Sequence, residues 1–397
     1  MPPRLSWHSV STIKLPGSPG WWARLKTAVV RSPGAGQTPA AGPPVCESVL
    51  AWALAHPGTE VRRLLPPGRV VKQPPRTIEP EVNDKFSAKE YPIPEKYLAR
   101  LPGARLVSDL GLMVLPDGSF AAESIYGRSH LEAAPGYRAP LPAHPVQMAG
   151  DYYSLVIEYA LDGNYYHWLH DVVLRLFGIL EHLPSDMRFI VPPNLRPFQL
   201  ESLALIGVGP QRLYPYDGTQ AWELEHLYFS PPTVGSGGDS PAADAWLRAL
   251  ALQTYGIVPG PPHRRIYVSR RNARYRRILN EAEVEAYLAE HGFEAHLLEN
   301  YSFREQVALF AEAEMVFAGH GAGHTNMIFA PPGLTVIDVF EPSEFNKCYW
   351  NMSEAVGHHY WYMCGETRAN ESGYAGDIIV PAAKLAEIVT RALAQRG

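Results

Sequence analysis

The sequence predicts an α/β fold with two lobes, preceded by a β-rich lead-in. Predicted strands and helices alternate between residues 154 and 230, and the alternation resumes between residues 265 and 340. A stretch rich in proline, glycine and serine, residues 231–241, separates the two runs. Such alternation is typical of a parallel sheet covered by helices on both faces. Two lobes of this kind joined by a hinge enclose a cleft, which is a natural ligand site.

Length and charge are consistent with this organisation. A chain of 397 residues is long enough for two separate cores. The formal charge of −5 argues against nucleic acid as a partner, since no basic excess is present to neutralise phosphates. We expect a partly irregular N-terminal extension at 1–100, a lobe at 101–235, a second lobe at 236–380 and a C-terminal helix at 381–397.

Cysteine usage and hydropathy indicate the compartment. Three scattered cysteines support neither a disulfide framework nor a zinc site, and they favour a reducing cytoplasm. No apolar run of about 18 residues is present, so no membrane span is expected. A peripheral membrane contact is an additional expectation, because Trp21 and Trp22 stand close to Arg24 and Lys26.

The first half of the chain contains a predicted hairpin and the first alternating run. A short helix is expected near residues 46–56, and residues 105–125 predict a hairpin with Asp117 and Gly118 at its turn. The alternating run then predicts a strand at 154–160, a helix at 165–182, a strand at 187–191, a helix at 196–206 and a strand at 224–230.

The second run has clearer helix signals. After a strand at 265–269, Asn280 with Glu283 and Ser302 with Glu305 have the spacing of capping boxes, so a helix is expected after each. Further strands are predicted at 293–298, 315–318 and 335–340. The helix at 382–395 is expected to pack across both lobes.

The most informative segment is a glycine turn after the predicted strand 315–318. The strand stops at Gly319 and is followed by His320-Gly-Ala-Gly323, including Gly321 and Ala322, and by residues that open a helix. Glycines let a ligand approach the free N–H groups, and the helix start attracts an anion such as phosphate. The spacing is neither that of a dinucleotide fingerprint nor that of a P-loop. The alternative is a tight turn whose histidine only caps the helix.

Other polar residues are expected at the same edge of the sheet. Arg270 follows the strand 265–269, and its guanidinium is suited to binding phosphate oxygens. Asn326 stands near the helix start, where it is expected to support the turn. Glu341 ends the strand 335–340 and is suited to accepting ribose hydroxyls, the alternative being a solvated carboxylate. The remaining basic residues read as a solvated loop: Arg271, Arg274 and Arg276.

Acid–base candidates lie on the predicted helix 165–182. His167, His170 and Asp171 have the spacing i, i+3 and i+4, so they project from one side of that helix. An imidazole oriented by a carboxylate can remove a proton from a hydroxyl near neutral pH. Either Asp171 or His167 is the expected base, with His170 as its partner. The alternative is a pair of structural histidines.

A metal site is the weaker explanation of the histidines in the second lobe. His320 and His324 stand at i and i+4, and His358 and His359 follow downstream. These residues resemble zinc ligands in type, but no His-Glu-x-x-His motif is present. We therefore expect neither a metal nor a cofactor.

The ordered motifs together resemble glycosyltransferase family 61. The resemblance covers about residues 105–362 and includes Arg265-Ile-Tyr-Val-Ser-Arg270, Arg277-Ile-Leu-Asn-Glu281, the glycine turn and Asn164-Tyr-Tyr-His-Trp-Leu-His-Asp171. It implies a GT-B-like fold with two Rossmann-like lobes and inverting transfer from a nucleotide sugar. It also adds Ser269 and Arg277 to the donor-binding candidates. His324 and Gly319 depart from the residues that the family usually has at these positions.

The resemblance implies a function for each lobe. The lobe at 101–235 would bind a glycan or polysaccharide acceptor and supply the base, and the lobe at 236–380 would bind the nucleotide-sugar donor. Similar bacterial proteins act in capsular polysaccharide biosynthesis, which implies a cytoplasmic enzyme, alternatively peripheral to the inner membrane. Two alternatives remain: a non-catalytic glycan- or nucleotide-binding protein on the same scaffold, and a metal-dependent hydrolase.

Overall fold

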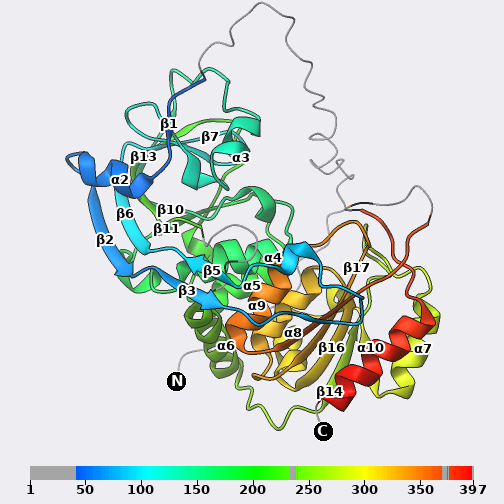
Figure 1. The fold of residues 1–397 in the computed structure, drawn as a ribbon. Coiled ribbons are helices and arrows are strands. Elements are labelled where there is room, and N and C mark those ends of the chain that lie inside the picture. Colours follow the sequence, from blue (N-terminus) through cyan, green and yellow to red (C-terminus); the bar gives the residue numbers. More distant parts are fainter. Residues whose placement is uncertain (1–41, 233–237, 239, 369–372, 374, 396–397) are drawn as a thin grey trace, which may run out of the picture. The chain divides into compact units, whose positions relative to one another are not determined.

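The computed structural model describes residues 42–232, 238, 240–368, 373 and 375–395. Most of the predicted hinge, and the tryptophans Trp21 and Trp22, lie outside these residues. The described part is a mixed α/β structure, as predicted, with two main sheets and a small antiparallel pair formed by β3 (Gly68–Val71) and β5 (Glu90–Ile93) (Figure 1). We call the ten-stranded sheet the first sheet and the six-stranded sheet the second sheet.

The second sheet is parallel throughout. Its order is β15 (Phe293–His296), β14 (Arg264–Val268), β16 (Ala313–Gly319), β17 (Thr335–Phe340), β18 (His359–Cys364) and β4 (Arg76–Thr77). Side chains alternate along its strands between two cores, with Ile266 and Val268 in one and Tyr267 in the other. Both faces are therefore buried, which explains the apolar strand sequences.

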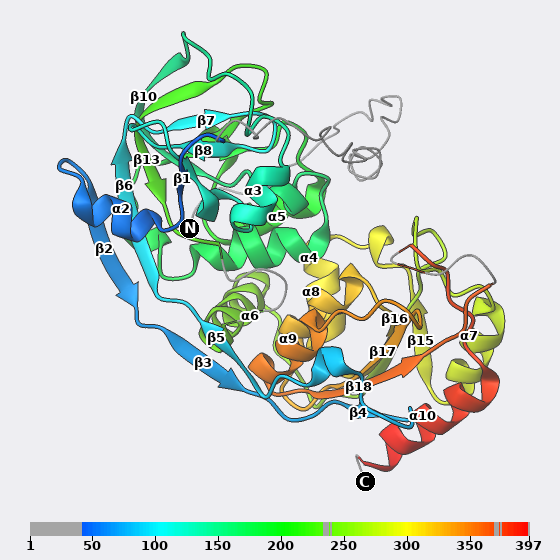
Figure 2. The ribbon, with the colours of Figure 1, turned by 45° about the horizontal axis from the view of Figure 1, so that its top comes forward.

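Helices cover both faces of the second sheet. Figure 2 shows α7 (Glu281–Glu290) and α10 (Ala382–Ala394) on one side and α8 (Phe303–Ala311) and α9 (Cys348–Val356) on the other. The 3-10 helix η9 (Ala322–Phe329) and α6 (Pro241–Tyr255) belong to the same core as α8. The helix α10 buries Leu385 and Ile388 against this sheet, so the expectation that it packs across both lobes is wrong.

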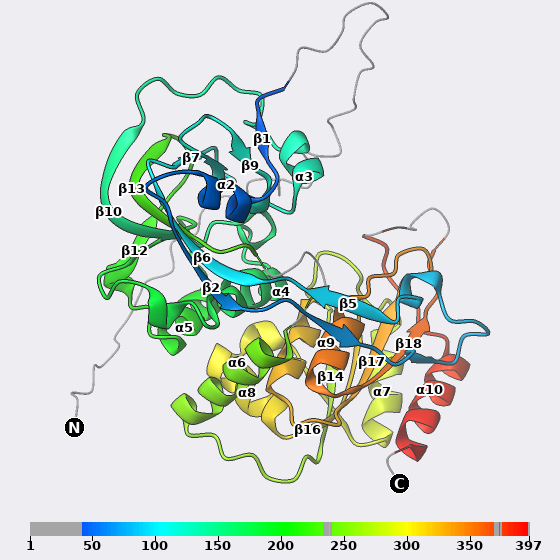
Figure 3. The same cartoon turned by 60° about the vertical axis from the view of Figure 1, so that its left-hand side comes forward.

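The first sheet combines a parallel half with a half whose pairs are antiparallel except for β1 (Val45–Cys46) with β9 (Phe120–Ala121). The parallel half contains, in spatial order, β13 (Trp222–Phe229), β10 (Val146–Ser154), β11 (Arg188–Val191) and β12 (Leu213–Pro215). On the other side of β13 lie β7 (Arg105–Val107), β8 (Leu112–Val114), β9 and β1. The strand β6 (Lys96–Pro102) also pairs with β13, and β2 (Glu60–Leu65) pairs with β6 (Figure 3).

The predicted N-terminal extension contributes to both sheets. Before residue 101, β2 and most of β6 pair within the first sheet, while β4 is the edge strand of the second. The helix α2 (Val49–Ala55) begins at the Ser48 cap, close to the predicted 46–56. The remaining elements described are α3 (Arg128–Ala133), η1 (Asp84–Phe86), η2 (Ala122–Ser124), η7 (Pro210–Arg212) and η8 (Leu298–Asn300).

The strand predicted at the start of the first run is wrong in extent. The strand expected at 154–160 ends at Ser154, and the chain continues through the 3-10 helix η3 (Glu158–Ala160). The apolar residues Leu155 and Ile157 fill the core from an irregular segment, which periodicity does not distinguish from a strand. The helix α5 (Pro197–Leu205) lies within the predicted range.

The helix expected at 165–182 is shorter and irregular. It begins as α4 (Tyr165–His167), widens to the π-helix η4 (Trp168–Val173) and tightens to the 3-10 helix η5 (Leu174–Leu176). Gly178 then adopts φ +68, which favours glycine and ends the segment before the separate turn η6 (Leu180–His182). A π-turn of this kind frequently occurs at functional sites.

The two predicted capping boxes behave differently. Ser302 and Glu305 form the box at the start of α8 as predicted. The box predicted for Asn280 and Glu283 is absent, because the Asn280 side chain donates to the carbonyl of Val380 and accepts from its N–H. The predicted hairpin at 105–125 contains a further turn: Ser108 and Gly111 have positive φ, which separates β7 from β8.

Candidate active site

The strand order of the second sheet marks a ligand position. Numbered along the chain from β14, the strands β14 to β18 lie in the spatial order 2-1-3-4-5, so the connections after β14 and β16 leave in opposite directions. In open α/β sheets, ligands bind at the carboxyl ends of strands where the order reverses in this way. Ser269 and Arg270 follow β14 there, and His320 follows Gly319, the last residue of β16. Ser269, Arg270 and His320 therefore stand at the topological switch point.

Arg270 lies directly against the glycine turn. A β-carbon added to Gly321 would overlap the Arg270 guanidinium, and one added to Gly323 would stand 2.9 Å from Val268 Cγ1. Arg270 Nε donates to the Arg276 carbonyl at 3.0 Å, and Nη2 donates to the Tyr275 carbonyl at 2.8 Å. Space, rather than backbone strain, requires glycine here, since Gly321 has an extended φ of 176°.

A buried carboxylate organises the histidines of this turn. Asp338 Oδ2 lies 2.9 Å from His320 Nδ1 and accepts a hydrogen bond from the Tyr360 hydroxyl at 2.8 Å. Its Oδ1 lies 3.3 Å from His324 Nε2. The ring of Tyr349 lies 4.9 Å from that of His320 and 5.1 Å from that of His324. We call Asp338, His320, His324 and Tyr360 the Asp338 array.

The environment sets the charges of this array. Burial alone would raise the pKa of Asp338, but the adjacent His320 and His324 outweigh it and hold that pKa well below its ordinary value. Burial lowers the pKa of His320, and Asp338 only partly offsets this. Asp338 is therefore an anion that accepts a hydrogen bond from His320 Nδ1–H, and neutral His320 keeps Nε2 as its basic nitrogen.

A second array of the same kind lies on the segment formed by α4 and η4. Asp171 Oδ2 lies 2.7 Å from His167 Nδ1 and accepts from the Tyr126 hydroxyl at 2.5 Å. Its Oδ1 lies 2.8 Å from His170 Nδ1. Asp171 and His170 are buried, whereas the His167 side chain is 18% exposed. We call these residues the Asp171 array.

The Asp171 array also holds an anion. Burial would raise the pKa of Asp171, but hydrogen bonds from His167 and His170 hold it well below its ordinary range. Burial and the Asp171 charge raise the pKa of Tyr126 far above its usual value, so Tyr126 remains a donor. Asp171 therefore fixes the tautomer of His167, with the proton on Nδ1 and the basic lone pair on Nε2.

Aromatic and amide contacts join the two arrays. The Tyr166 ring stacks on His170 at 5.1 Å and meets the Tyr349 ring edge-on at 5.6 Å. The Tyr165 hydroxyl donates to Asn326 Oδ1 at 2.6 Å. Because Tyr349 also touches His320, the histidine-bearing segment and the glycine turn are neighbours in space.

Three predicted donor residues have other partners. Ser269 Oγ donates to Glu281 Oε1 at 2.5 Å, and Arg277 pairs with Asp377 at 2.5 Å. Glu341 Oε2 accepts from the N–H and hydroxyl of Ser343, while its buried Oε1 has no partner among the described residues. Ala322 is half-buried at the start of η9. Asn326 supports the turn as expected, donating to Gly323 O at 3.3 Å.

Sequence reasoning missed Tyr126, Asp338, Tyr349 and Tyr360. Asp338 had a usable signal, since it is the only charged residue of the apolar strand β17. A charge inside a strand buried on both faces requires a partner. The three tyrosines had no comparable signal, because aromatic residues are common in cores.

The metal alternative finds no support in the described part of the chain. No group of three or more histidine, cysteine or acidic side chains is arranged there to hold a metal ion. His358, one of the candidate ligands, instead has Nε2 2.9 Å from the Met327 carbonyl. Burial lowers the pKa of His358 to about 4, so it is a neutral hydrogen-bond donor.

Comparison with known proteins finds one similar family. Among the described residues, no helix is both long and apolar enough to cross a membrane. No curated protein matches the chain. Residues 165–337 match the family model described as Glycosyltransferase 61, and this range contains both the histidine-bearing segment and the glycine turn. Through residues 165–337 the chain is similar to glycosyltransferase family 61, and this similarity supports a glycosyltransferase.

Proposed function

We propose that this protein transfers a sugar from a nucleotide diphosphate donor to a glycan hydroxyl, with inversion at the anomeric carbon. The observation that carries the proposal is the contact between the Asp171 array and the glycine turn through Tyr166 and Tyr349. A base and a diphosphate site are then close to one another, as single displacement requires. The two sheets would act as the lobes of a GT-B-like enzyme.

The donor diphosphate would bind at the switch point of the second sheet. The N–H groups of Gly321, Ala322 and Gly323 point out of a helix start, and Arg270 supplies positive charge beside them. The unpartnered Oε1 of Glu341 is available for ribose hydroxyls. Ser269 and Arg277 receive no donor contact in this proposal, because Glu281 and Asp377 occupy them.

His167 would be the base and Asp171 its orienting carboxylate. Asp171 accepts from both histidines and from Tyr126, whereas His167 Nε2 is free of that carboxylate. The acceptor hydroxyl would give its proton to Nε2 while its oxygen attacks the anomeric carbon. The bond from that carbon to the diphosphate breaks on the opposite face. The electron pair leaves with the diphosphate, whose charge Arg270 stabilises.

A groove beside the Asp171 array suits the acceptor. Its volume is about 370 Å³, and Tyr97, Glu123 and Tyr126 contribute to its lining. Aromatic rings stack on sugar faces, and carboxylates accept from sugar hydroxyls. Because Tyr126 also donates to Asp171, a glycan in the groove would lie next to the base. We propose a polysaccharide-building role in the cytoplasm, consistent with the free cysteines Cys46, Cys348 and Cys364.

The test combines binding with product analysis. A thermal-shift panel of sugar nucleotides identifies the best-stabilising donor, and mass spectrometry then detects its glycan product. We expect the product to form in the presence of a chelator and to disappear in His167→Gln with donor binding retained. Product formation undiminished in His167→Gln would contradict the assigned base. A donor that binds without any product would favour the non-catalytic alternative, and chelator sensitivity would favour a metal-dependent hydrolase.

A further inference from the structure

The first sheet has a switch point of its own. In its parallel half β11 and β12 follow β10 on one side, whereas β13 lies on the other side of β10. The carboxyl ends of β10 and β13 therefore lie together, with Tyr153 opposite Tyr228 in the register. Strand ends of this kind form the crevices in which α/β proteins bind ligands. The proposed donor site uses only the switch point of the second sheet.

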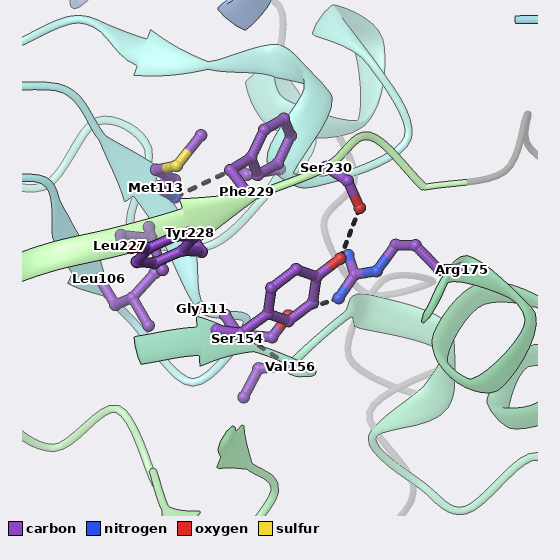
Figure 4. Close-up of a pocket in the computed structure, with 12 residues that line it drawn as sticks. Leu106, Gly111, Met113, Ser154, Val156, Arg175, Leu227, Tyr228, Phe229 and Ser230 are labelled. Carbon is purple, nitrogen blue, oxygen red and sulfur yellow. Dashed lines mark hydrogen bonds between the residues drawn. The ribbon is translucent and has the colours of Figure 1, made fainter. Parts of the chain in front are cut away.

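A cavity lies at these strand ends. Its volume is about 20 Å³, which is enough for one small group, and its polar lining includes Ser154, Arg175 and Ser230 (Figure 4). The hydroxyls of Tyr153 and Ser230 share one hydrogen bond of 2.5 Å. Because the pair carries two protons, one O–H remains to donate to an occupant. The cavity thus offers hydrogen-bond donors to whatever occupies it.

Arg175 brings a buried positive charge to this cavity. Its side chain is almost fully buried, at 4% relative exposure, and its guanidinium lies 5.2 Å from the centre of the Tyr153 ring. Nη2 donates to the Ser154 carbonyl, while the buried Nε has no hydrogen-bond partner among the described residues. No carboxylate in the described part of the chain forms an ion pair with Arg175. A buried cation without an anion is costly.

Lys96 adds a second cation next to the first. Its Nζ lies 3.5 Å from the carbonyl of Leu174, the residue before Arg175, and no described carboxylate pairs with it. Burial, together with the charge of Arg175, lowers the pKa of Lys96 to about 7. The effect of Arg175 on this pKa means that the two positive charges repel each other. A negative charge in the cavity beside Arg175 would offset the burial cost of Arg175 and weaken its repulsion of Lys96.

We propose that a small monovalent anion, of the size of chloride, binds in the cavity between Arg175, Ser154 and Ser230. The Arg175 Nε–H and the available hydroxyl donate to it, and its charge offsets Arg175 and Lys96. The small volume favours a compact ion. The site is independent of the proposed transferase chemistry. Arg175, which lines the site, lies four residues after Asp171 on the same helical segment.

The experiment measures anion-dependent stability and locates the ion. The melting temperature is recorded as chloride replaces gluconate at constant ionic strength, since gluconate is too large for the cavity. We expect the melting temperature to change little at chloride concentrations below the dissociation constant and to rise by about 2 °C for each tenfold increase above it. Crystals grown or soaked in bromide should show an anomalous peak in contact with the Arg175 guanidinium.

Matched variants test the assignment. Arg175→Met should abolish the chloride response, and Ser230→Ala should weaken it. Arg212→Met is the control, because Arg212 also donates to a carbonyl, that of Met187, and lies 5.0 Å from the Phe189 ring. It should lower stability while leaving the chloride response intact. A wild-type protein whose melting temperature does not rise with chloride, or that shows no bromide peak at Arg175, would overturn the proposal even if Arg175→Met fails to fold.

Discussion

The Asp171 array and the Asp338 array contain the same parts but differ in exposure. Each has an ionised aspartate that contacts two histidines and accepts from one tyrosine. In the Asp171 array, His167 is partly exposed and able to meet a substrate. In the Asp338 array, both histidines are buried and contact the Tyr349 ring, and His320 also stacks on Phe340. One chemical arrangement therefore suits proton transfer in the first case and rigid electrostatic support in the second.

The largest expected effect comes from His167, the exposed histidine of the comparison. His167→Gln removes the proposed base, and we expect kcat to fall by about 1,000-fold while donor affinity and melting temperature change little. Steady-state kinetics with the preferred donor measures this. His182→Gln is the control, since His182 contacts Arg62 and no residue of either array. A fall in kcat of less than tenfold in His167→Gln would contradict the proposed proton-transfer role of the Asp171 array.

Gly321→Ala should have the next largest effect. The new methyl group overlaps the Arg270 guanidinium, which then leaves the turn. Loss of a charge-assisted phosphate contact should weaken nucleotide diphosphate binding by about 30- to 100-fold in calorimetry. Gly260→Ala, at a glycine with open space around it, should bind normally. Unchanged affinity in Gly321→Ala would show that the diphosphate binds elsewhere.

Asp338→Asn tests the supporting role of the buried array. The amide keeps the size but loses the charge that orients His320 and His324, so we expect donor affinity to fall by about tenfold or more. The kcat at saturating donor should change less than in His167→Gln. Asp151→Asn, which alters the distant pair Asp151–His226 at 3.0 Å, should leave affinity unchanged. If Asp151→Asn and Asp338→Asn changed donor affinity equally, the Asp338 array would have no specific role in donor binding.

The smallest effect concerns pH. Burial lowers the pKa of His320, so His320 is neutral in the free enzyme near pH 7. A diphosphate at the turn favours the imidazolium, which raises this pKa in the complex. Nucleotide affinity should therefore increase as pH falls below neutrality, by up to about tenfold per unit for a single proton. Calorimetry at several pH values measures the nucleotide affinity, and His320→Gln should make this affinity independent of pH. A flat wild-type profile would argue against proton uptake at His320.

Local signals predicted much of the fold and part of the candidate site. The strand β17 has the predicted bounds, and α8 begins at the predicted Ser302 capping box. Both predictions depend on residues that are only a few positions apart in the sequence. The segment 154–160 was misread because Leu155 and Ile157 are apolar for reasons of tertiary burial, not strand pairing. Asn280 likewise has the local signature of a box, but Val380 competes for its side chain.

The sequence alone determined the alternation of strands and helices, the glycine turn and the pairing of His167 with Asp171, because these depend on spacings within one element. Only the tertiary structure decided which carboxylates become the centres of arrays. Tyr126 reaches Asp171 across 45 residues, Tyr360 reaches Asp338 across 22, and Tyr165 meets Asn326 across 161. Contacts over such separations depend on how the sheets order their strands and bury charge. No spacing along the chain records that information.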